Sequence, residues 1–145
     1  MHKIYLSGPI TSIGVKVAHR RFTYAEKCLE AAERRWRRHI GKPEGHDWRI
    51  VNPMRENPYK EGRRWVTCMM LDLLLLLKCD SVMMLPGWER SRGARIERRM
   101  ARLLGKKIFF FHPECVKFHF SSDGGRMTLS HFPPFCFPIP GYPAP

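Results

Sequence analysis

Apolar positions along this chain follow two patterns that alternate with each other. Short apolar runs are typical of buried strands, and stretches whose apolar residues recur every three or four positions are typical of helices. The predicted strands lie at residues 4–6, 48–53, 80–85 and 107–111. The predicted helices lie at residues 15–40, 63–78 and 91–105. Because such alternation produces a parallel sheet with helices on both faces, we expect an α/β, flavodoxin-like (Rossmann-like) fold of four to five strands.

The pattern changes after His112. Residues 113–145 show no helical period and end in a segment rich in proline and aromatic residues. We interpret them as a C-terminal extension with polyproline character, in which residues 117–120 are a candidate fifth strand. The chain is therefore predicted to contain an α/β domain at residues 1–112. Residues 54–62 contain an Asn-Pro turn signal and are predicted to form a connecting loop.

The part of the sequence that indicates a site most clearly is residues 79–105. A buried strand ends there at Pro86-Gly87, a strong turn signal, and Ser91 suits the N-cap of the helix that follows. Ligands of open α/β sheets bind where strands end and helices begin, and the free N–H groups there favour an anion. Glu97 lies in the second turn of this helix amid arginines, so it is the leading candidate for a functional carboxylate. The alternative is an ion pair between Glu97 and arginines one turn away, such as Arg92 or Arg102.

The first predicted strand also ends in a sequence of interest, Ser7-Gly8-Pro9. Gly8 would let a ligand come close to the backbone. Taken alone, an ordinary turn between a strand and a helix is the simpler interpretation.

The helix predicted at residues 63–78 is apolar nearly all round towards its end. Such a helix is covered on two sides within the monomer or packs against another subunit. We favour a homo-oligomer, a dimer or larger, formed through Leu71–Leu77. Asp72 interrupts this run, and a carboxylate buried there without partners would cost several kcal/mol. Asp72 therefore either pairs with a basic residue or is a site carboxylate near Glu97.

Composition narrows the choice of partners. The chain has 145 residues and a formal net charge of +13, which suits one domain that meets anionic partners such as nucleotides, nucleic acid or an acidic protein surface. The basic face of residues 15–40 is a candidate nucleic-acid surface. We favour a solvated helix face instead, because most runs of charge are no more than that.

Cysteine usage and hydropathy bear on the compartment. The five cysteines are odd in number and form no CxxC pair, so we expect reduced thiols in a cytoplasmic protein. No cluster of cysteines and histidines has the spacing of a zinc site. We expect no cofactor. The N-terminus enters a strand almost at once, which argues against a signal peptide. The most apolar stretch, residues 65–77, is too short to span a membrane.

Several short motifs, taken together, resemble one superfamily. They are Ile4-Tyr5-Leu6-Ser7-Gly8-Pro9-Ile10, Val51-Asn52-Pro53, Asp72-Leu73 with Cys79-Asp80, Leu85-Pro86-Gly87-Trp88 and Ser91-Arg92-Gly93-Ala94-Arg95-Ile96-Glu97. In this order, over about residues 1–112, they resemble the small nucleoside 2-deoxyribosyltransferase-like domains of phages and bacteria. More distantly they resemble the nucleoside 2-deoxyribosyltransferases and the 2′-deoxynucleoside 5′-phosphate N-hydrolases. The resemblance implies a flavodoxin-like fold and cleavage of an N-glycosidic bond in a small-molecule nucleoside or nucleotide.

The resemblance also implies roles for individual residues. Glu97 matches the nucleophilic glutamate, and Asp72 matches a second carboxylate that acts as an acid or contacts the base. Ser91 matches the serine that holds the phosphate in the N-hydrolases. The other substrate-binding candidates come from the same motifs: Ser7, Gly8, Pro9, Ile10, Asn52, Arg92 and Gly93. Two departures are that Arg95-Ile96-Glu97 replaces the usual Gly-Tyr-Glu pattern and that the C-terminal extension has no counterpart.

The chemistry explains why two carboxylates are needed. Breaking a C1′–N bond gives C1′ oxocarbenium character, which one carboxylate can capture while a second carboxylic acid protonates the leaving base. Water then gives hydrolysis, and another base gives transfer. A non-catalytic nucleotide-binding or regulatory module of the same fold is the first alternative. A nucleic-acid-binding protein is the second, and no base-stacking motif supports it. With the resemblance, we favour catalysis.

Overall fold

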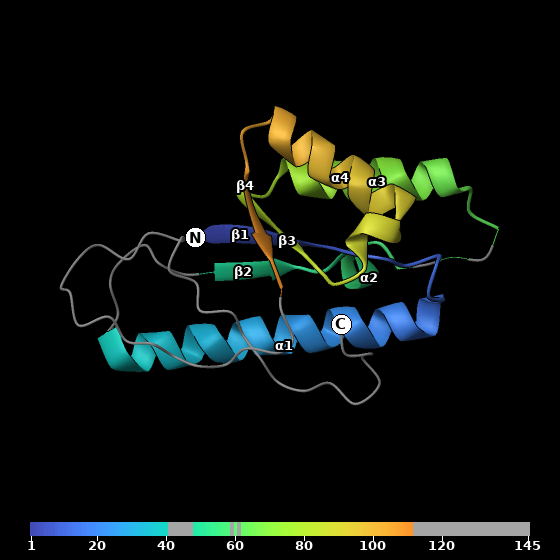
Figure 1. Cartoon of the computed structure of the whole chain (residues 1–145). Helices are drawn as coiled ribbons and strands as arrows, with labels where there is room; N and C mark the ends of the chain where they lie inside the picture. The colour runs from blue at the N-terminus through green and yellow to red at the C-terminus, as the bar shows by residue number, and fades with distance from the viewer. Residues whose placement is uncertain (41–47, 59, 61, 112–145) are drawn as a thin grey trace. The chain divides into compact units, whose positions relative to one another are not determined.

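The computed structural model describes residues 1–40, 48–58, 60 and 62–111 of the chain. Within them, parallel strands form one sheet in the order β2-β1-β3-β4 (Figure 1). The strands are β1 (His2–Ser7), β2 (Trp48–Val51), β3 (Ser81–Met84) and β4 (Lys107–Phe110). This sheet confirms the predicted α/β, flavodoxin-like fold. The predicted extension at residues 113–145, with its candidate strand, lies outside the described residues.

The two middle strands, β1 and β3, end level with each other. Ser7, the last residue of β1, is in register with Met84, the last residue of β3. Successive side chains of a strand point to opposite faces of the sheet. Tyr5 and Ser7 therefore share one face of β1, and Ile4 and Leu6 share the other. All four residues are fully buried.

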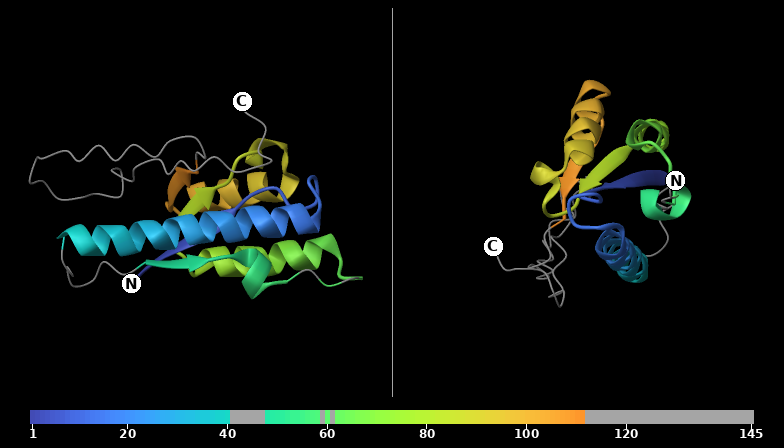
Figure 2. Two further views of the ribbon diagram at one scale, coloured as in Figure 1. Left: turned by 90° about the horizontal axis from the view of Figure 1, so that it is seen from below. Right: turned by 90° about the vertical axis from the view of Figure 1, so that its right-hand side faces the viewer.

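Helices cover both faces of the sheet, as predicted (Figure 2). On one face lies α1 (Val15–Ile40), and on the other lie α3 (Trp65–Leu77) and α4 (Arg92–Leu103). A buried core cluster joins the middle of the sheet to α3 and α4. Its members are Tyr5, Val51, Leu76, Cys79, Val82, Met84, Ala94 and Ala101. Removing such apolar side chains from water stabilises the fold by roughly 25 cal/mol per Å² buried.

A short helix, α2 (Pro53–Glu56), occupies the start of the segment that was predicted to be a connecting loop at residues 54–62. That prediction was wrong for these residues, and the preceding strand ends at Val51 rather than at Pro53. The cause is local. Asn52 Oδ1 accepts the backbone N–H of Met54 at 3.0 Å, and Pro53 occupies the first helical position, where its missing N–H costs nothing. One helical turn is too short to show a period in the sequence.

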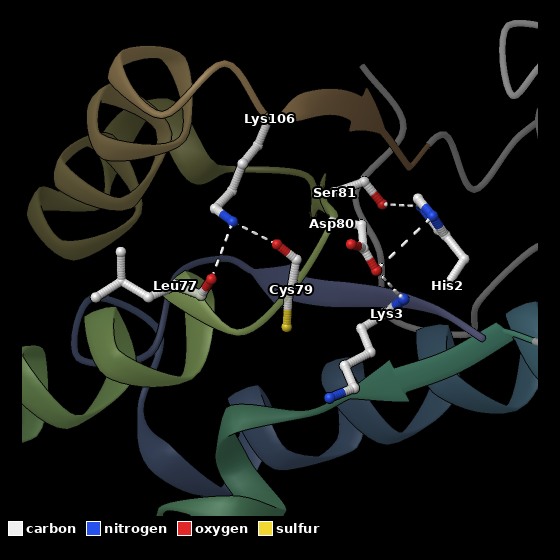
Figure 3. A network of polar contacts seen from close by, with 7 residues as sticks. All are labelled: His2, Lys3, Leu77, Cys79, Asp80, Ser81 and Lys106. Carbon is white, nitrogen blue, oxygen red and sulfur yellow. Dashed lines mark hydrogen bonds and ion pairs between the residues drawn. The ribbon is translucent and has the colours of Figure 1, made fainter.

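A polar network holds the amino edge of the sheet (Figure 3). The backbone N–H of Lys3 donates to Asp80 Oδ2 at 2.7 Å, and His2 Nε2 lies 3.0 Å from Ser81 Oγ. Burial lowers the pKa of His2, with the Asp80 carboxylate acting in the opposite direction. These contacts tie the start of β1 to the start of β3.

Lys106 lies near the same edge and binds the end of α3 (Figure 3). Its Nζ donates to the carbonyl oxygen of Leu77 at 3.1 Å and also to that of Cys79. Carbonyl groups in the last turn of a helix have no partner within the helix, so a lysine there satisfies them. The contact fixes the end of α3 beside the segment that follows α4.

One face of α3 is apolar and exposed. The exposed fractions are 37% for Trp65, 59% for Val66, 61% for Met70, 36% for Leu71, 52% for Leu74 and 48% for Leu77. Asp72 and Leu76 lie on the buried side of the same helix. The predicted homo-oligomer through Leu71–Leu77 stays a prediction. No helix in the described part of the chain is both long and apolar enough to cross a membrane.

Candidate functional site

The candidate site lies at the carboxyl edge of the sheet, where β1 and β3 end. From β1 the chain crosses to β2 on one side, and from β3 it crosses to β4 on the other side. The direction of the crossovers therefore reverses between β1 and β3. In open α/β sheets, ligands bind at such a switch point, outside the carboxyl ends of the strands.

Glu97 of α4 reaches this edge and contacts β1. Its Oε1 accepts a hydrogen bond from Tyr5 Oη at 2.7 Å, and its Oε2 accepts one from Ser7 Oγ at 2.5 Å. Only 6% of Glu97 is exposed. Among the described residues, no ion pair to Glu97 is present. The alternative that Glu97 pairs with arginines of its own helix, such as Arg92 or Arg102, therefore does not hold.

The buried side of α4 explains how Glu97 reaches the strand. This side consists of Ala94, Glu97 and Ala101, which recur at the spacing of one helix face. Because alanine is small, the helix axis comes close to the sheet. The arginines that surround Glu97 in the sequence lie mainly on the exposed side of the helix: Arg92, Arg95, Arg99 and Arg102.

The environment of Glu97 shifts its titration towards neutral pH. Burial raises the pKa of Glu97 from 4.5 to about 7, and the nearby Asp72 carboxylate acts in the same direction. The hydrogen bonds from Ser7 and Tyr5 oppose this shift because they stabilise the anion. A carboxyl group that titrates near pH 7 is available as an anion and as an acid, which is typical of functional carboxylates.

Tyr5 is a site residue that the sequence reasoning did not identify. Burial raises the pKa of Tyr5 well above its usual value, and the Glu97 and Asp72 carboxylates add to this shift. The phenol therefore remains a hydrogen-bond donor throughout the range in which Glu97 titrates. The available signal was the period of two along β1, because Tyr5 lies two residues before Ser7 on the same face.

Asp72 provides the second buried carboxylate. It lies on the inner side of α3, is 9% exposed, and its Oδ1 accepts a hydrogen bond from Asn57 Nδ2 at 2.9 Å. Burial raises the pKa of Asp72, whereas the Asn57 hydrogen bond and the Arg63 charge lower it. The charge of Asp72 acts on both Glu97 and Tyr5. The two predicted carboxylates thus share one electrostatic environment.

Neighbouring side chains occupy the space around Gly8, in the turn after β1. A Cβ atom on Gly8 would lie 2.9 Å from Leu85 Cβ and 3.3 Å from Phe22 Cζ, so no side chain fits at this position. Pro9 is buried and Ile10 is half-buried. Glycine at position 8 is therefore explained by the close packing of the strand ends, which agrees with the simpler interpretation of this turn.

The start of α4 lies beside the start of α3. Ser91 caps α4 as predicted, because its Oγ accepts a backbone N–H of the first turn at 3.3 Å. The Arg92 guanidinium lies 4.8 Å from the centroid of the Trp65 ring, and Arg92 itself is exposed. A Cβ atom on Gly93 would lie 3.6 Å from Met69 Sδ, an ordinary contact distance. A helix N-terminus next to an exposed arginine is an environment that favours an anion.

Asn52 belongs to a separate polar cluster. Its Nδ2 donates to Glu26 Oε2 at 2.9 Å, and the same carboxylate oxygen lies 2.9 Å from Arg55 Nη2. Its Oδ1 caps α2, so both ends of the Asn52 amide are occupied by protein groups. Within the described residues, no hydrogen bond joins Asn52 to Glu97.

The groups of the site that can take part in chemistry are two buried carboxylates (Glu97 and Asp72) and two hydroxyl donors (Tyr5 and Ser7). The start of α4 adds exposed arginines. Among the described residues, no three His, Cys, Asp or Glu side chains come together as possible metal ligands. Two carboxylates that repel each other favour a state in which one is ionised and the other carries a proton. Such a pair can combine nucleophilic and acid catalysis.

Comparison with known families gives a match for this chain. The model of a family described as Domain of unknown function (DUF4406) matches residues 2–110. No curated protein and no solved structure matches the chain. The matched range contains every site residue described above.

Proposed function

We propose that this chain, which belongs to the DUF4406 family, acts on the N-glycosidic bond of a (deoxy)nucleoside or nucleoside 5′-monophosphate. The bond is cleaved or transferred through a glycosyl-enzyme intermediate on Glu97, and Asp72 is the acid. One observation carries this proposal. The buried Glu97 carboxylate accepts hydrogen bonds from Tyr5 and Ser7, and a second buried carboxylate raises its pKa.

In the first step, an oxygen of ionised Glu97 forms a bond to C1′ while the C1′–N bond breaks. The electron pair of that bond passes to the base, whose nitrogen takes the proton of Asp72. Tyr5 and Ser7 hold the Glu97 carboxylate in one orientation, which saves the entropy of fixing it during the reaction. In the second step, water or another base attacks C1′ and gives its proton to Asp72, and the bond to Glu97 breaks.

The reaction needs one carboxyl group ionised and the other protonated. Glu97 accepts two hydroxyl hydrogen bonds, and each of them stabilises the anion. Burial raises the pKa of Asp72 as well, while the Asn57 hydrogen bond and the Arg63 charge lower it. Because the two groups interact, the limits of activity belong to the pair: base release should fall at low pH, where both are protonated, and at high pH, where both are ionised.

The arginines at the start of α4 favour a substrate that carries a phosphate. Arg92 and Arg95 are exposed beside the N-terminus of the helix whose second turn holds Glu97. A guanidinium group can bind two phosphate oxygens at once, and the helix dipole adds to the attraction. We accordingly place the chain in cytoplasmic nucleotide metabolism rather than on a membrane or on nucleic acid.

The alternative is a nucleotide-binding or regulatory module of the same fold without catalysis. The observation in its favour is that both oxygens of Glu97 accept hydrogen bonds from β1 and that 6% of the residue is exposed. In that case the carboxylate would tie α4 to the sheet. The two functions differ in turnover and not in binding.

The test is chromatography of the free bases released from a panel of nucleosides and 5′-monophosphates, with and without a second base. Wild type, Glu97→Gln and Glu30→Gln are compared. Glu30 is a partly exposed glutamate of α1 and makes a matched control for the loss of one carboxylate. We expect release by wild type and Glu30→Gln and none by Glu97→Gln. Formation of a new nucleoside would identify transfer.

Release that persists in Glu97→Gln would contradict the proposed nucleophile. Binding of a nucleotide to the folded protein without any release would support the regulatory module instead. Calorimetry with the same panel measures this binding independently of turnover.

A further inference from the structure

The segment between α2 and α3 holds a polar chain that ends on Asp72. Arg63 Nη1 donates to Asn57 Oδ1 at 2.5 Å, and Asn57 Nδ2 donates to Asp72 Oδ1 at 2.9 Å. The same amide nitrogen lies 3.4 Å from the carbonyl oxygen of Cys68. Asn57 was noted in the sequence only as part of an Asn-Pro turn signal, and neither Asn57 nor Arg63 was a candidate site residue.

The order of donors and acceptors fixes the direction of this chain. A guanidinium group can only donate hydrogen bonds, so the Asn57 atom that faces Arg63 has to be the carbonyl oxygen. The amide nitrogen then faces Asp72 and the Cys68 carbonyl oxygen, which are both acceptors. Turning the amide by half a rotation would oppose carbonyl and carboxylate oxygens at Asp72 and leave Arg63 without its acceptor.

The helix that carries Asn57 is itself anchored to α1. Asn57 is the C-cap of α2, and its backbone N–H bonds to the carbonyl oxygen of Pro53 at 2.8 Å. At the other end of α2, Glu26 of α1 accepts a hydrogen bond from Asn52 and forms an ion pair with Arg55. Glu26 is buried, so these contacts hold α2 against α1.

We propose that Asn57 and Arg63 are positioning residues that determine which oxygen of Asp72 carries its proton. Because Oδ1 faces a donor, the proton of the neutral acid is carried by Oδ2, to which no described residue donates. The acid of the reaction therefore delivers its proton from Oδ2 only. This inference rests on the proposed function in giving Asp72 the role of an acid, and it adds the residues that orient that acid.

Three titratable groups interact with Asp72, each from a different element or segment. Arg63 precedes α3, Glu97 lies on α4 and Tyr5 lies on β1. Arg63 is the only cation among these three groups. Removing either Asn57 or Arg63 takes away stabilisation of the Asp72 anion, so both changes act in the same direction on its titration.

The experiment measures the pH profile of base release and the carboxyl titration of Asp72 by carbon-13 NMR. The variants are Asn57→Ala, Arg63→Gln and the control Arg64→Gln. Arg64 is adjacent in sequence and exposed, and its side chain makes no capping hydrogen bond. Loss of the Asp72 signal in Asp72→Asn assigns the resonance.

We expect Asn57→Ala to raise the Asp72 pKa and to move the pH profile of base release to higher pH by about one to two units, as fits loss of one hydrogen bond to a charged group. Arg63→Gln should move both in the same direction, because it removes a nearby cation. Arg64→Gln should change neither. Two readouts separate this inference from the proposed function. An Asp72 pKa that rises without any base release in wild type would uphold the positioning and remove the reaction. An Asp72 pKa and profile that both stay unchanged, or that Arg64→Gln moves equally, would overturn the positioning.

Discussion

The hydrogen bond from Tyr5 to Glu97 can be tested by removing one oxygen atom. Tyr5→Phe keeps the buried ring and deletes the donor that lies 2.7 Å from Glu97 Oε1. Burial and the Asp72 carboxylate raise the Glu97 pKa, and the two hydroxyl donors hold it down at about 7. Loss of one donor should therefore raise this pKa further.

The size of the shift follows from the energy of the bond. A hydrogen bond to a charged group contributes roughly 1.5–3 kcal/mol, and each pKa unit corresponds to about 1.4 kcal/mol. Tyr5→Phe should therefore raise the Glu97 pKa by about one to two units. In the proposed reaction Glu97 must be ionised, so the ionised fraction at neutral pH, and with it the rate of base release, should fall.

Carbon-13 NMR of the glutamate carboxyl groups measures the shift directly. The Glu97 signal is the one that disappears in Glu97→Gln. Tyr24→Phe is the control, because it also removes a phenol oxygen but lies on α1, on the other face of the sheet. A Glu97 pKa that is unchanged or lowered in Tyr5→Phe, or raised equally in Tyr24→Phe, would refute the account of this site.

Three further predictions concern stability and assembly. Since the Glu97 pKa is higher in the folded protein than its usual 4.5, the unfolded chain loses its proton first; the free energy of unfolding should fall by about 3 kcal/mol as pH rises from about 4.5 to about 7, and urea titrations in which Glu97→Gln shows the same fall would contradict this. Gly8→Ala should lower the free energy of unfolding by roughly 1–3 kcal/mol, because the new methyl group would overlap Leu85; an unchanged urea midpoint would show that the turn can open. Leu74→Glu should convert a homo-oligomer to a monomer in sedimentation at several concentrations, whereas Val17→Glu, on α1 and 43% exposed, should not; a monomeric wild type would remove the predicted interface.

The sequence predicted the parts of this structure that depend on local pattern. Short apolar runs located the strands, the period of 3.6 located the long helices, and the Ser91 cap followed from its side-chain chemistry. The hydrogen bond between Glu97 and Ser7 was not predicted, since 90 residues separate them; the resemblance implied only that both belong to the site. Tyr5 was placed correctly in a strand, but an aromatic residue in a buried strand is ordinary, so its hydroxyl went unnoticed.

The contacts of Asn57, Arg63 and Glu26 could not be predicted in this way. They depend on α2, whose single turn leaves no period, and on the path of the segment between α2 and α3. Glu26 lies in a long basic helix, where an acidic residue is usually a solvated partner for nearby lysines and arginines. Its burial became visible only when Asn52 and Arg55 were placed against it.

The position of β1 has a consequence for how the molecule folds. This strand is made before β2, β3 and β4, yet it is a middle strand of the sheet, and both of its neighbours come later in the chain. The hydrogen bond between Tyr5 and Glu97 joins residues that are 92 positions apart in the chain. Contacts between residues so far apart in sequence form slowly during folding. Until β3 has been made, the apolar run Ile4-Tyr5-Leu6 has an unpaired edge, which is the kind of segment that aggregates. The strand that supplies two donors to the site is thus also a segment of the nascent chain that is prone to aggregate until β3 pairs with it.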